Sequence, residues 1–275
     1  TPAQGVVSSG DYITEVNHQK IEGKKQLMDL VEHLDGEKVL LTVRRENTIL
    51  EKKLTPVQIS KGNYRLGIWV RDNVQGLGTI TFLTKNNRFA ALGHGIHDVD
   101  TSTLLTIKRG TLYRTSIQKV QKGSKGNPGT MEGIIVYNRF HRLGVIEKNT
   151  DEGIYGELNS DRSWIGEEVT IQVAKKEEIK TGEARIRCYI DGEVKEYTIC
   201  ITQIDKESDQ VNKGMVIQVT DTELLEKTGG IIQGMSGSPI IQNGKLIGAV
   251  THVFVQDSTK GYGIFIENML KEEES

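Results

Sequence analysis

Apolar residues along this chain fall mostly into short runs rich in Val, Ile and Thr, separated by turns that contain glycine. Such runs cover residues 76–83, 184–190, 194–201 and 245–250, among others. Runs of this length and composition, bounded by turn residues, predict β-strands. Because helical periodicity is almost absent beyond residue 64, the pattern predicts a mainly β architecture, an antiparallel sandwich or barrel.

The first part of the chain has a different pattern. Residues 24–34 carry four apolar side chains at the spacing of an amphipathic helix, which ends at Asp35-Gly36. A strand over residues 10–17 precedes this helix, and strands over 39–45 and 48–54 follow it. The pattern therefore predicts a small α+β domain over residues 1–58, a linker over 59–65 and a larger β domain over 66–275.

Two cysteines, Cys188 and Cys200, lie in neighbouring predicted strands. Asp191-Gly192 between these strands predicts a two-residue hairpin turn, which pairs Cys188 with Lys195. Cys200 then lies roughly 17 Å along the strand from Lys195, at the usual rise per residue. A disulfide cannot span that separation, so we expect two free thiols, which do not indicate a redox compartment.

Composition excludes several classes of function. The formal net charge is −2, with 35 basic and 37 acidic residues, and aromatic residues make up 5% of the chain. We therefore expect no nucleic-acid partner. No apolar run approaches the ~18 residues of a membrane span, so no membrane anchor is expected within this chain. The first residue is Thr rather than Met, which we interpret as a processed product or a fragment.

The stretch Gly234-Met235-Ser236-Gly237-Ser238-Pro239 is the first candidate for chemistry. It leads into an apolar hairpin that turns at Asn243-Gly244. A serine between glycines in such a turn is accessible, and the glycines leave main-chain N–H groups free to bind an oxyanion. The stretch is compatible with a nucleophilic serine and with an ordinary turn between two strands.

The second candidate is His94, which leaves an apolar strand between Gly93 and Gly95. Flanking glycines allow the imidazole to lie at the edge of a cleft, although a structural histidine fits the pattern equally well. His97, Asp98 and Asp100 follow and suggest a metal site. No third ligand accompanies them at a recognisable spacing, and the helical zinc motif is missing. We expect neither a metal nor any other cofactor.

Several motifs together resemble known proteases. Residues 10–17, with the helix and two strands that follow, resemble the second half of a PDZ domain. Gly76-x-Gly78, a strand, an Asn-rich turn and Gly93-His94 resemble the N-terminal barrel of trypsin-like proteases, especially the HtrA type. The Gly-x-Ser-Gly motif, the hairpin and a final Gly-x-Gly-Ile-x-Ile resemble their C-terminal barrel. These resemblances imply a double β-barrel preceded by a partial PDZ-like domain.

A narrower resemblance covers essentially the whole chain and is most specific over residues 213–270. The runs Glu226-Lys227-Thr228-Gly229-Gly230, 234–239 and Thr251-His252-Val253-Phe254-Val255 resemble the SpoIVB peptidases of endospore-forming bacteria. This resemblance implies a serine endopeptidase in which Ser236 is the nucleophile and His94 the base.

The same resemblance implies roles for further residues. The backbone N–H groups of Gly234 and Ser236 would form the oxyanion hole. Thr251, His252 and Val253 would pair with the substrate backbone. The resemblance implies that Ser238 is not the nucleophile, because the serine of the Gly-x-Ser-Gly motif is Ser236.

The acidic partner of His94 is the least defined member of the expected triad. The family resemblance implies Asp221, fifteen positions before Ser236. Trypsin-like proteases instead place the acid some tens of residues after the histidine. In that window Asp98 and Asp100 lie close to His94, and the next aspartate is Asp151. Either Asp221 approaches His94 from an unusual side or its role is structural.

The resemblance also implies a biological role in sporulation. Such a protease is secreted from the forespore into the space between the two membranes. It cuts membrane-associated regulators of an intramembrane protease and so permits sigma-K activation. Self-cleavage near the N-terminus, usual in this family, would account for a chain that begins at Thr1. The alternatives are an HtrA-type quality-control protease and an inactive scaffold with a PDZ-like and a protease-like part.

Overall fold

A computed structural model describes residues 1–161, 163–165 and 169–275, which divide into two compact units. Unit 1 comprises Thr1–Gly76 and Asp98–Thr103, and unit 2 comprises Leu77–His97 and Leu104–Ser275. None of the helices formed by these residues has the length and apolar character that crossing a membrane requires.

Unit 1 contains a four-stranded antiparallel sheet in the order β2-β1-β3-β4 and one helix, α1 (Lys24–Glu32). The strands are β1 (Tyr12–Val16), β2 (Gln19–Lys20), β3 (Val39–Arg45) and β4 (Thr48–Leu54). Leu27 of the helix is buried against Leu41 and Val43 of β3 in one apolar core. The α+β pattern predicted for this region is therefore present, and its likeness to a PDZ domain stays a prediction.

The end of unit 1 differs from the sequence-based boundaries. The expected linker forms an antiparallel hairpin of β5 (Val57–Ser60) and β6 (Asn63–Arg65). The sequence-based boundaries place residues 66–70 at the start of the larger β domain, but these residues form no strand. Leu66 is instead buried in the core of unit 1. The division between the compact units therefore follows Gly76 rather than residue 65.

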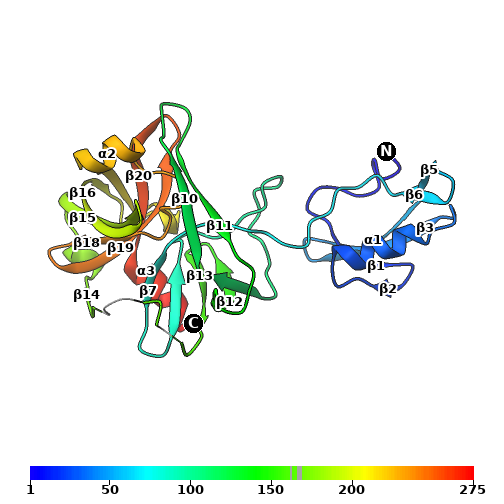
Figure 1. The fold of residues 1–275 in the computed structure, drawn as a ribbon, viewed down its shortest axis with the longest axis horizontal. Coiled ribbons are helices and arrows are strands. Elements are labelled where there is room, and N and C mark those ends of the chain that lie inside the picture. The colour runs from blue at the N-terminus through cyan, green and yellow to red at the C-terminus, as the bar shows by residue number, and fades with distance from the viewer. Residues whose placement is uncertain (162, 166–168) are drawn as a thin grey trace. The chain divides into compact units, whose positions relative to one another are not determined.

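The first half of unit 2 is a five-stranded antiparallel sheet in the order β7-β8-β13-β12-β9 (Figure 1). Its strands are β7 (Ile80–Leu83), β8 (Arg88–Ala91), β9 (Gly110–Tyr113), β12 (Arg142–Thr150) and β13 (Gly153–Leu158). A separate hairpin pairs β10 (Thr115–Gln121) with β11 (Thr130–Ile135). The chain leaves β8 at its end toward His94, so this sheet positions the candidate base.

The second half of unit 2 is a closed barrel of six strands in the order β19-β18-β15-β16-β17-β20, because β20 pairs back onto β19 (Figure 1). The strands are β15 (Gly182–Ile190), β16 (Glu193–Ile204), β17 (Met215–Val219), β18 (Pro239–Gln242), β19 (Lys245–Phe254) and β20 (Asp257–Phe265). The short β14 (Gln172–Val173) pairs in parallel with β19. The prediction of a mainly β fold with a C-terminal barrel is confirmed.

Short helical segments complete unit 2. They are the 3₁₀ turns η1 (Lys176–Glu178) and η2 (Val211–Lys213) and the helices α2 (Thr222–Thr228) and α3 (Ile266–Glu274). The hairpin at Asp191-Gly192 has the predicted register, with Cys188 opposite Lys195, and both cysteines are free.

A shared apolar core joins the two halves of unit 2. Ala90 and Tyr155 of the five-stranded sheet are buried in one cluster with Ala249 and Ile264 of the barrel. Met269 of α3 belongs to the same cluster. Burying apolar surface favours association without specifying direction, so this cluster holds the halves together. The alignment of the two halves at the candidate site depends instead on directional hydrogen bonds between them.

Candidate active site

The turn that carries Ser236 is hydrogen-bonded to the chain segment at the start of β7. The backbone N–H of Thr79 donates to the carbonyl of Ser236 at 2.8 Å. The Thr81 hydroxyl donates to the carbonyl of Gly237, also at 2.8 Å. Both acceptors lie immediately before the barrel strand β18, whereas both donors belong to the five-stranded sheet or the segment entering it. The serine turn is therefore fixed to the half of unit 2 that carries His94.

Gly237 allows the two backbones to approach closely. Its φ is +90°, and a Cβ added there would lie 2.1 Å from the Thr79 carbonyl oxygen and 2.6 Å from the Leu92 nitrogen. Only glycine fits a positive φ at such an approach without strain. Leu92 lies two residues before His94, so this contact places the segment carrying the imidazole beside the serine turn.

Thr251 of β19 contacts both sides of the site. A Cβ added at Gly93 would lie 3.1 Å from the Thr251 side-chain methyl group. The Ser236 hydroxyl donates to the Thr251 carbonyl at 2.8 Å. The β19–β20 ladder shifts register between Val250 and Val253, and such bulges redirect side chains and leave backbone groups unpaired. This bulge makes the Thr251 carbonyl accessible to the serine.

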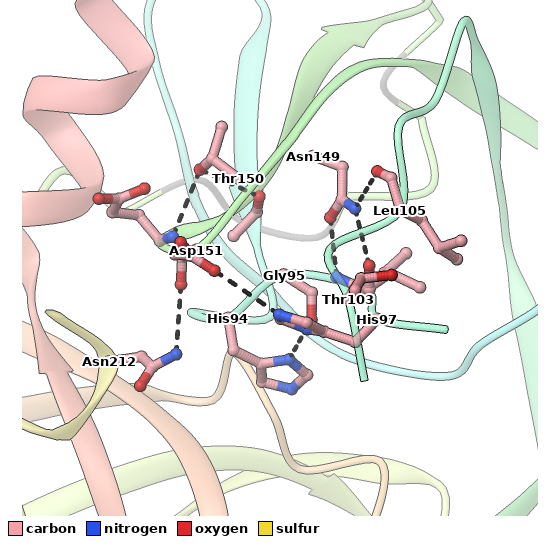
Figure 2. Close-up of polar contacts among 12 residues, drawn as sticks. His94, Gly95, His97, Thr103, Leu105, Asn149, Thr150, Asp151 and Asn212 are labelled. Carbon is pink, nitrogen blue, oxygen red and sulfur yellow. Dashed lines mark hydrogen bonds and ion pairs between the residues drawn. The ribbon is translucent and has the colours of Figure 1, made fainter. Parts of the chain in front are cut away.

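His94 is half-buried and has a defined tautomer. Its Nδ1 lies 2.9 Å from the carbonyl oxygen of Gly95 (Figure 2). Because a carbonyl oxygen only accepts, the Nδ1 carries the proton of the neutral ring and the Nε2 keeps its lone pair. Burial lowers the pKa of His94, which favours the neutral form. The ring is thus in the state that a general base requires.

The imidazole ring of His94 lies against that of His252, with ring centroids 4.6 Å apart. Among the described residues, no hydrogen bond joins His94 to Ser236, whose hydroxyl bonds to Thr251 instead. The expected nucleophile and base are therefore brought to one place by Thr251 and its neighbour His252. Their mutual hydrogen bond is not formed in this arrangement.

The backbone around Ser236 provides two free donors. Within the part of the chain that the structure describes, the N–H groups of Gly234 and Ser236 have no acceptor, whereas the N–H of Gly237 donates to Val250 at 2.8 Å. Unpaired N–H groups beside a partly exposed serine hydroxyl are what an oxyanion hole requires. The predicted role of these two groups is compatible with the local geometry.

Asp221 has structural contacts at both carboxylate oxygens. It is the N-cap residue of α2, where Oδ1 accepts from the backbone N–H of Leu224 at 3.0 Å. Oδ2 accepts from the backbone N–H of Thr198 at 3.1 Å. No contact between Asp221 and His94 is present among the described residues. Its expected membership of the triad stays a prediction.

The acidic residues that follow His94 in the sequence also have other partners. Asp98 and Asp100 both form ion pairs with Arg71 within unit 1. The Nε2 of His97 lies 3.6 Å from Oδ1 of Asp151 (Figure 2). In the residues that the structure describes, no group of three or more His, Cys, Asp or Glu side chains is placed to hold a metal ion.

The family model described as SpoIVB peptidase S55 matches residues 62–270. The chain belongs to the SpoIVB peptidase S55 family. This is the family that the sequence resemblance implied. The matched range begins within the hairpin of β5 and β6 and includes all of unit 2 except its last residues.

More distant similarities accompany this match. A Helicobacter pylori (strain J99) protein, named as a candidate zinc metalloprotease, is 34% identical over 83 residues. The match covers 26% of this chain, which spans about a quarter (23%) of that relative's length. Among solved structures, the inactive Ser343Ala form of Rv3671c from M. tuberculosis H37Rv is similar with a TM-score of 0.33 and 15% identity, over 54% of this chain and 82% of the other. The active form of the Rv3671c protease from M. tuberculosis is similar with a TM-score of 0.33 and 13% sequence identity. The match covers 57% of this chain and 79% of the other.

We expect the histidine pair to make stability depend on pH. Burial, with a smaller effect of His94, lowers the pKa of His252 to about 4, while the unfolded chain protonates histidine near its ordinary pKa of about 6.5. The unfolded state therefore binds more protons between these values, and acidification from pH 6.5 toward 4 reduces the free energy of unfolding. Urea unfolding at pH 7.5 and pH 5 measures this loss.

The matched variant for this measurement is His252→Gln, which removes the titrating group and keeps a polar side chain. Carboxylates contribute to the acid dependence of both proteins, so the difference between them isolates His252. We expect a smaller loss of stability between pH 7.5 and pH 5 in the variant. Equal losses in the two proteins would contradict the effect of burial on His252.

Proposed function

We propose that this protein is a selective serine endopeptidase that acts as a signalling protease of sporulation. It would cut regulators of an intramembrane protease and thereby permit sigma-K activation. The observation that carries the catalytic part is the approach of the serine turn to the histidine segment at Gly237 and Leu92. Membership of the SpoIVB peptidase S55 family supports the assignment to sporulation.

In the proposed mechanism, Ser236 Oγ attacks the scissile carbonyl while the Nε2 of His94 accepts the hydroxyl proton. The protonated imidazole then gives this proton to the leaving amine. The N–H groups of Gly234 and Ser236 stabilise the oxyanion, and one such donor is typically worth ~10²–10³ in rate.

The resting arrangement requires one rearrangement before this chemistry. The Ser236 hydroxyl must exchange the Thr251 carbonyl for the Nε2 of His94. One neutral hydrogen bond replaces another, so the exchange involves energies of about 1 kcal/mol.

Thr251, His252 and Val253 are the proposed substrate-binding residues. The bulge at this point of β19 interrupts the ladder to β20, and an extended peptide can pair with backbone groups left open in this way. Replacement of His252 and Val253 should therefore alter cleavage specificity. The proposed substrates are membrane-associated regulatory proteins, and the protein itself by self-cleavage, in the space between forespore and mother cell.

The deciding experiment incubates the protein and its Ser236→Ala variant with unfolded proteins, folded proteins and a peptide panel. Cleavage at few sites by the unmodified protein alone supports a signalling protease. General degradation of unfolded proteins would indicate HtrA-type quality control instead. Identical results for the two proteins would overturn the peptidase assignment and favour a scaffold.

A further inference from the structure

We propose that residues 134–142, here called the basic apolar loop, bind the surface of an anionic lipid bilayer. The loop includes the end of β11 and the first residue of β12, and it belongs to unit 2. Its arginines would bind lipid phosphates, and its aromatic side chains would enter the boundary between headgroups and acyl chains. The proposal concerns binding alone, so it holds whether or not the proposed peptidase function is correct.

Charge is unevenly distributed along this chain. Residues 104–146 contain eight Lys or Arg and one acidic residue, Glu132, which give this segment a net charge of +7. The whole chain carries −2, so the remaining residues together carry −9. Among the described residues, none of the eight basic side chains forms an ion pair. Basic side chains gathered in one segment of an acidic protein indicate an anionic partner. The eight are Lys108, Arg109, Arg114, Lys119, Lys122, Lys125, Arg139 and Arg142.

Four large apolar side chains of the basic apolar loop are exposed. The exposed fractions are 56% for Ile134, 44% for Val136, 58% for Tyr137 and 79% for Phe140. A single exposed apolar side chain is ordinary in a folded protein. Four of them within seven consecutive residues form a patch of the kind that marks an interaction site.

The backbone of the loop is fixed by hydrogen bonds. The Asn138 side-chain oxygen accepts from the N–H groups of Phe140 at 2.9 Å and His141 at 3.0 Å. The His141 carbonyl accepts from the N–H of Arg114 at 2.8 Å. Phe140 is therefore exposed by a defined turn, and a partner that binds it does not have to order the loop first.

Arginines lie beside the exposed aromatic side chains. The guanidinium carbon of Arg139 lies 4.8 Å from the centroid of the Phe140 ring. Arg142 is opposite Tyr113 in the β12–β9 ladder, and the Tyr113 ring packs edge-on against Tyr137 with centroids 5.2 Å apart. Amphipathic surfaces that lie in a membrane interface combine basic residues with aromatic ones in this way.

The exposure of Phe140 favours a bilayer over an acidic polypeptide. An acidic polypeptide matches the positive charge but leaves an exposed ring largely in water unless it has a complementary pocket. A bilayer interface accepts such a ring without a preformed pocket, because acyl chains adapt to its shape. Charge and exposed aromatic surface are therefore both used only in contact with anionic lipid.

The strand that leads into this loop also holds the serine turn. The N–H of Met131 in β11 donates to the carbonyl of Gln233 at 2.8 Å, close to Ser236 in the sequence. Tyr137 follows Met131 by six residues, which is roughly 20 Å at the rise of a strand. A bilayer bound at the loop would thus hold the candidate active site near the lipid surface. Such a position suits the membrane-associated substrates of the proposed function.

The first test is cosedimentation of the full chain with vesicles of phosphatidylcholine, with and without phosphatidylglycerol. We expect binding to the anionic vesicles that is about 10-fold or more tighter than binding to neutral ones, and that weakens at high NaCl concentration. Absence of binding, or equal binding to both kinds of vesicle, would overturn the proposal.

Two double variants separate the contributions of charge and apolar contact. Each Arg at an anionic surface contributes about 5-fold, so Arg139→Gln with Arg142→Gln should weaken binding roughly 25-fold. Tyr137→Ser with Phe140→Ser should weaken it by about 10-fold or more through loss of buried apolar area. Unchanged binding in the second variant, with loss in the first, would indicate contact through charge alone and contradict insertion of the rings.

The matched control is Tyr189→Ser with Val194→Ser. These side chains are opposite each other in the β15–β16 hairpin and are also exposed, at 42% and 61%. The control should bind anionic vesicles like the unmodified protein, and an equal loss there would show that the basic apolar loop is not the binding surface.

A gain-of-signal variant keeps the test decisive if a double variant fails to fold. Phe140→Trp places an indole in the loop, and its fluorescence emission should shift to the blue when the ring enters the interface of anionic vesicles. The unmodified protein, which has two Trp residues, provides the background. An unshifted emission in vesicle-bound Phe140→Trp protein would overturn the proposal.

Discussion

Replacement of Ser236 by alanine should abolish peptidase activity and leave the protein folded. Loss of a serine nucleophile typically costs about 10⁴–10⁶ in kcat, because the remaining binding groups cannot form the covalent intermediate. Among the described residues, the substitution removes one side-chain hydrogen bond, that from the Ser236 hydroxyl to the Thr251 carbonyl. Its loss should reduce the free energy of unfolding by about 1 kcal/mol. The kcat for peptide cleavage and the free energy of unfolding in urea, both determined on the same preparation, measure the two effects.

Ser238 provides the matched control for this variant. It lies two residues further along the same turn and is fully buried, and its hydroxyl lacks a hydrogen-bond partner among the described residues. Removing a buried, unpaired hydroxyl has no stability cost from lost hydrogen bonds. Ser238→Ala should therefore keep both activity and stability. Loss of activity in Ser238→Ala with an active Ser236→Ala would show that the nucleophile has been assigned to the wrong serine.

Replacement of Gly237 by alanine should both destabilise unit 2 and inactivate the site. A left-handed conformation costs a non-glycine residue roughly 1–2 kcal/mol. The added Cβ would also lie 2.1 Å from the Thr79 carbonyl and 2.6 Å from the Leu92 nitrogen, and both of these atoms are backbone. Relief requires the serine turn to move away from the histidine segment. We expect a total loss of about 4 kcal/mol or more, in the range of the most damaging single substitutions.

Gly244→Ala separates the two causes of that loss. Gly244 also has a positive φ, +74°, but no atom lies within 4 Å of its added Cβ. This variant should lose only the roughly 1–2 kcal/mol of backbone strain and keep its activity. Urea unfolding of both variants, with turnover at a temperature where each is folded, gives the comparison. Similar losses in the two would mean that close packing at Gly237 contributes little.

Much of the fold could be predicted from local sequence. The helix that begins at Lys24 and the strands Val39–Arg45 and Thr48–Leu54 lie where the apolar spacing placed them. The hairpin at Asp191-Gly192 has the predicted register. These features depend on residues a few positions apart, so periodicity and turn chemistry determine them. Residues 66–70 show the limit of such reasoning. Their apolar pattern suits a strand as well as it suits the irregular segment that they form in the core of unit 1.

Local sequence likewise predicts some residues of the candidate site and not others. A serine between glycines and a histidine after an apolar strand were visible in the sequence. Thr79 and Thr81, whose hydrogen bonds hold the serine turn, had no local signal at all. Their partners lie more than 150 positions away along the chain.

By itself the sequence determined which segments become strands and turns and which side chains carry chemistry, because those properties depend on near neighbours. Only the tertiary structure decided that Gly237 meets Leu92 and that the Ser236 hydroxyl bonds to Thr251. Such contacts follow from strand register and from a core shared between two sheets. Both are set by the packing of the whole unit, which no short stretch of sequence contains.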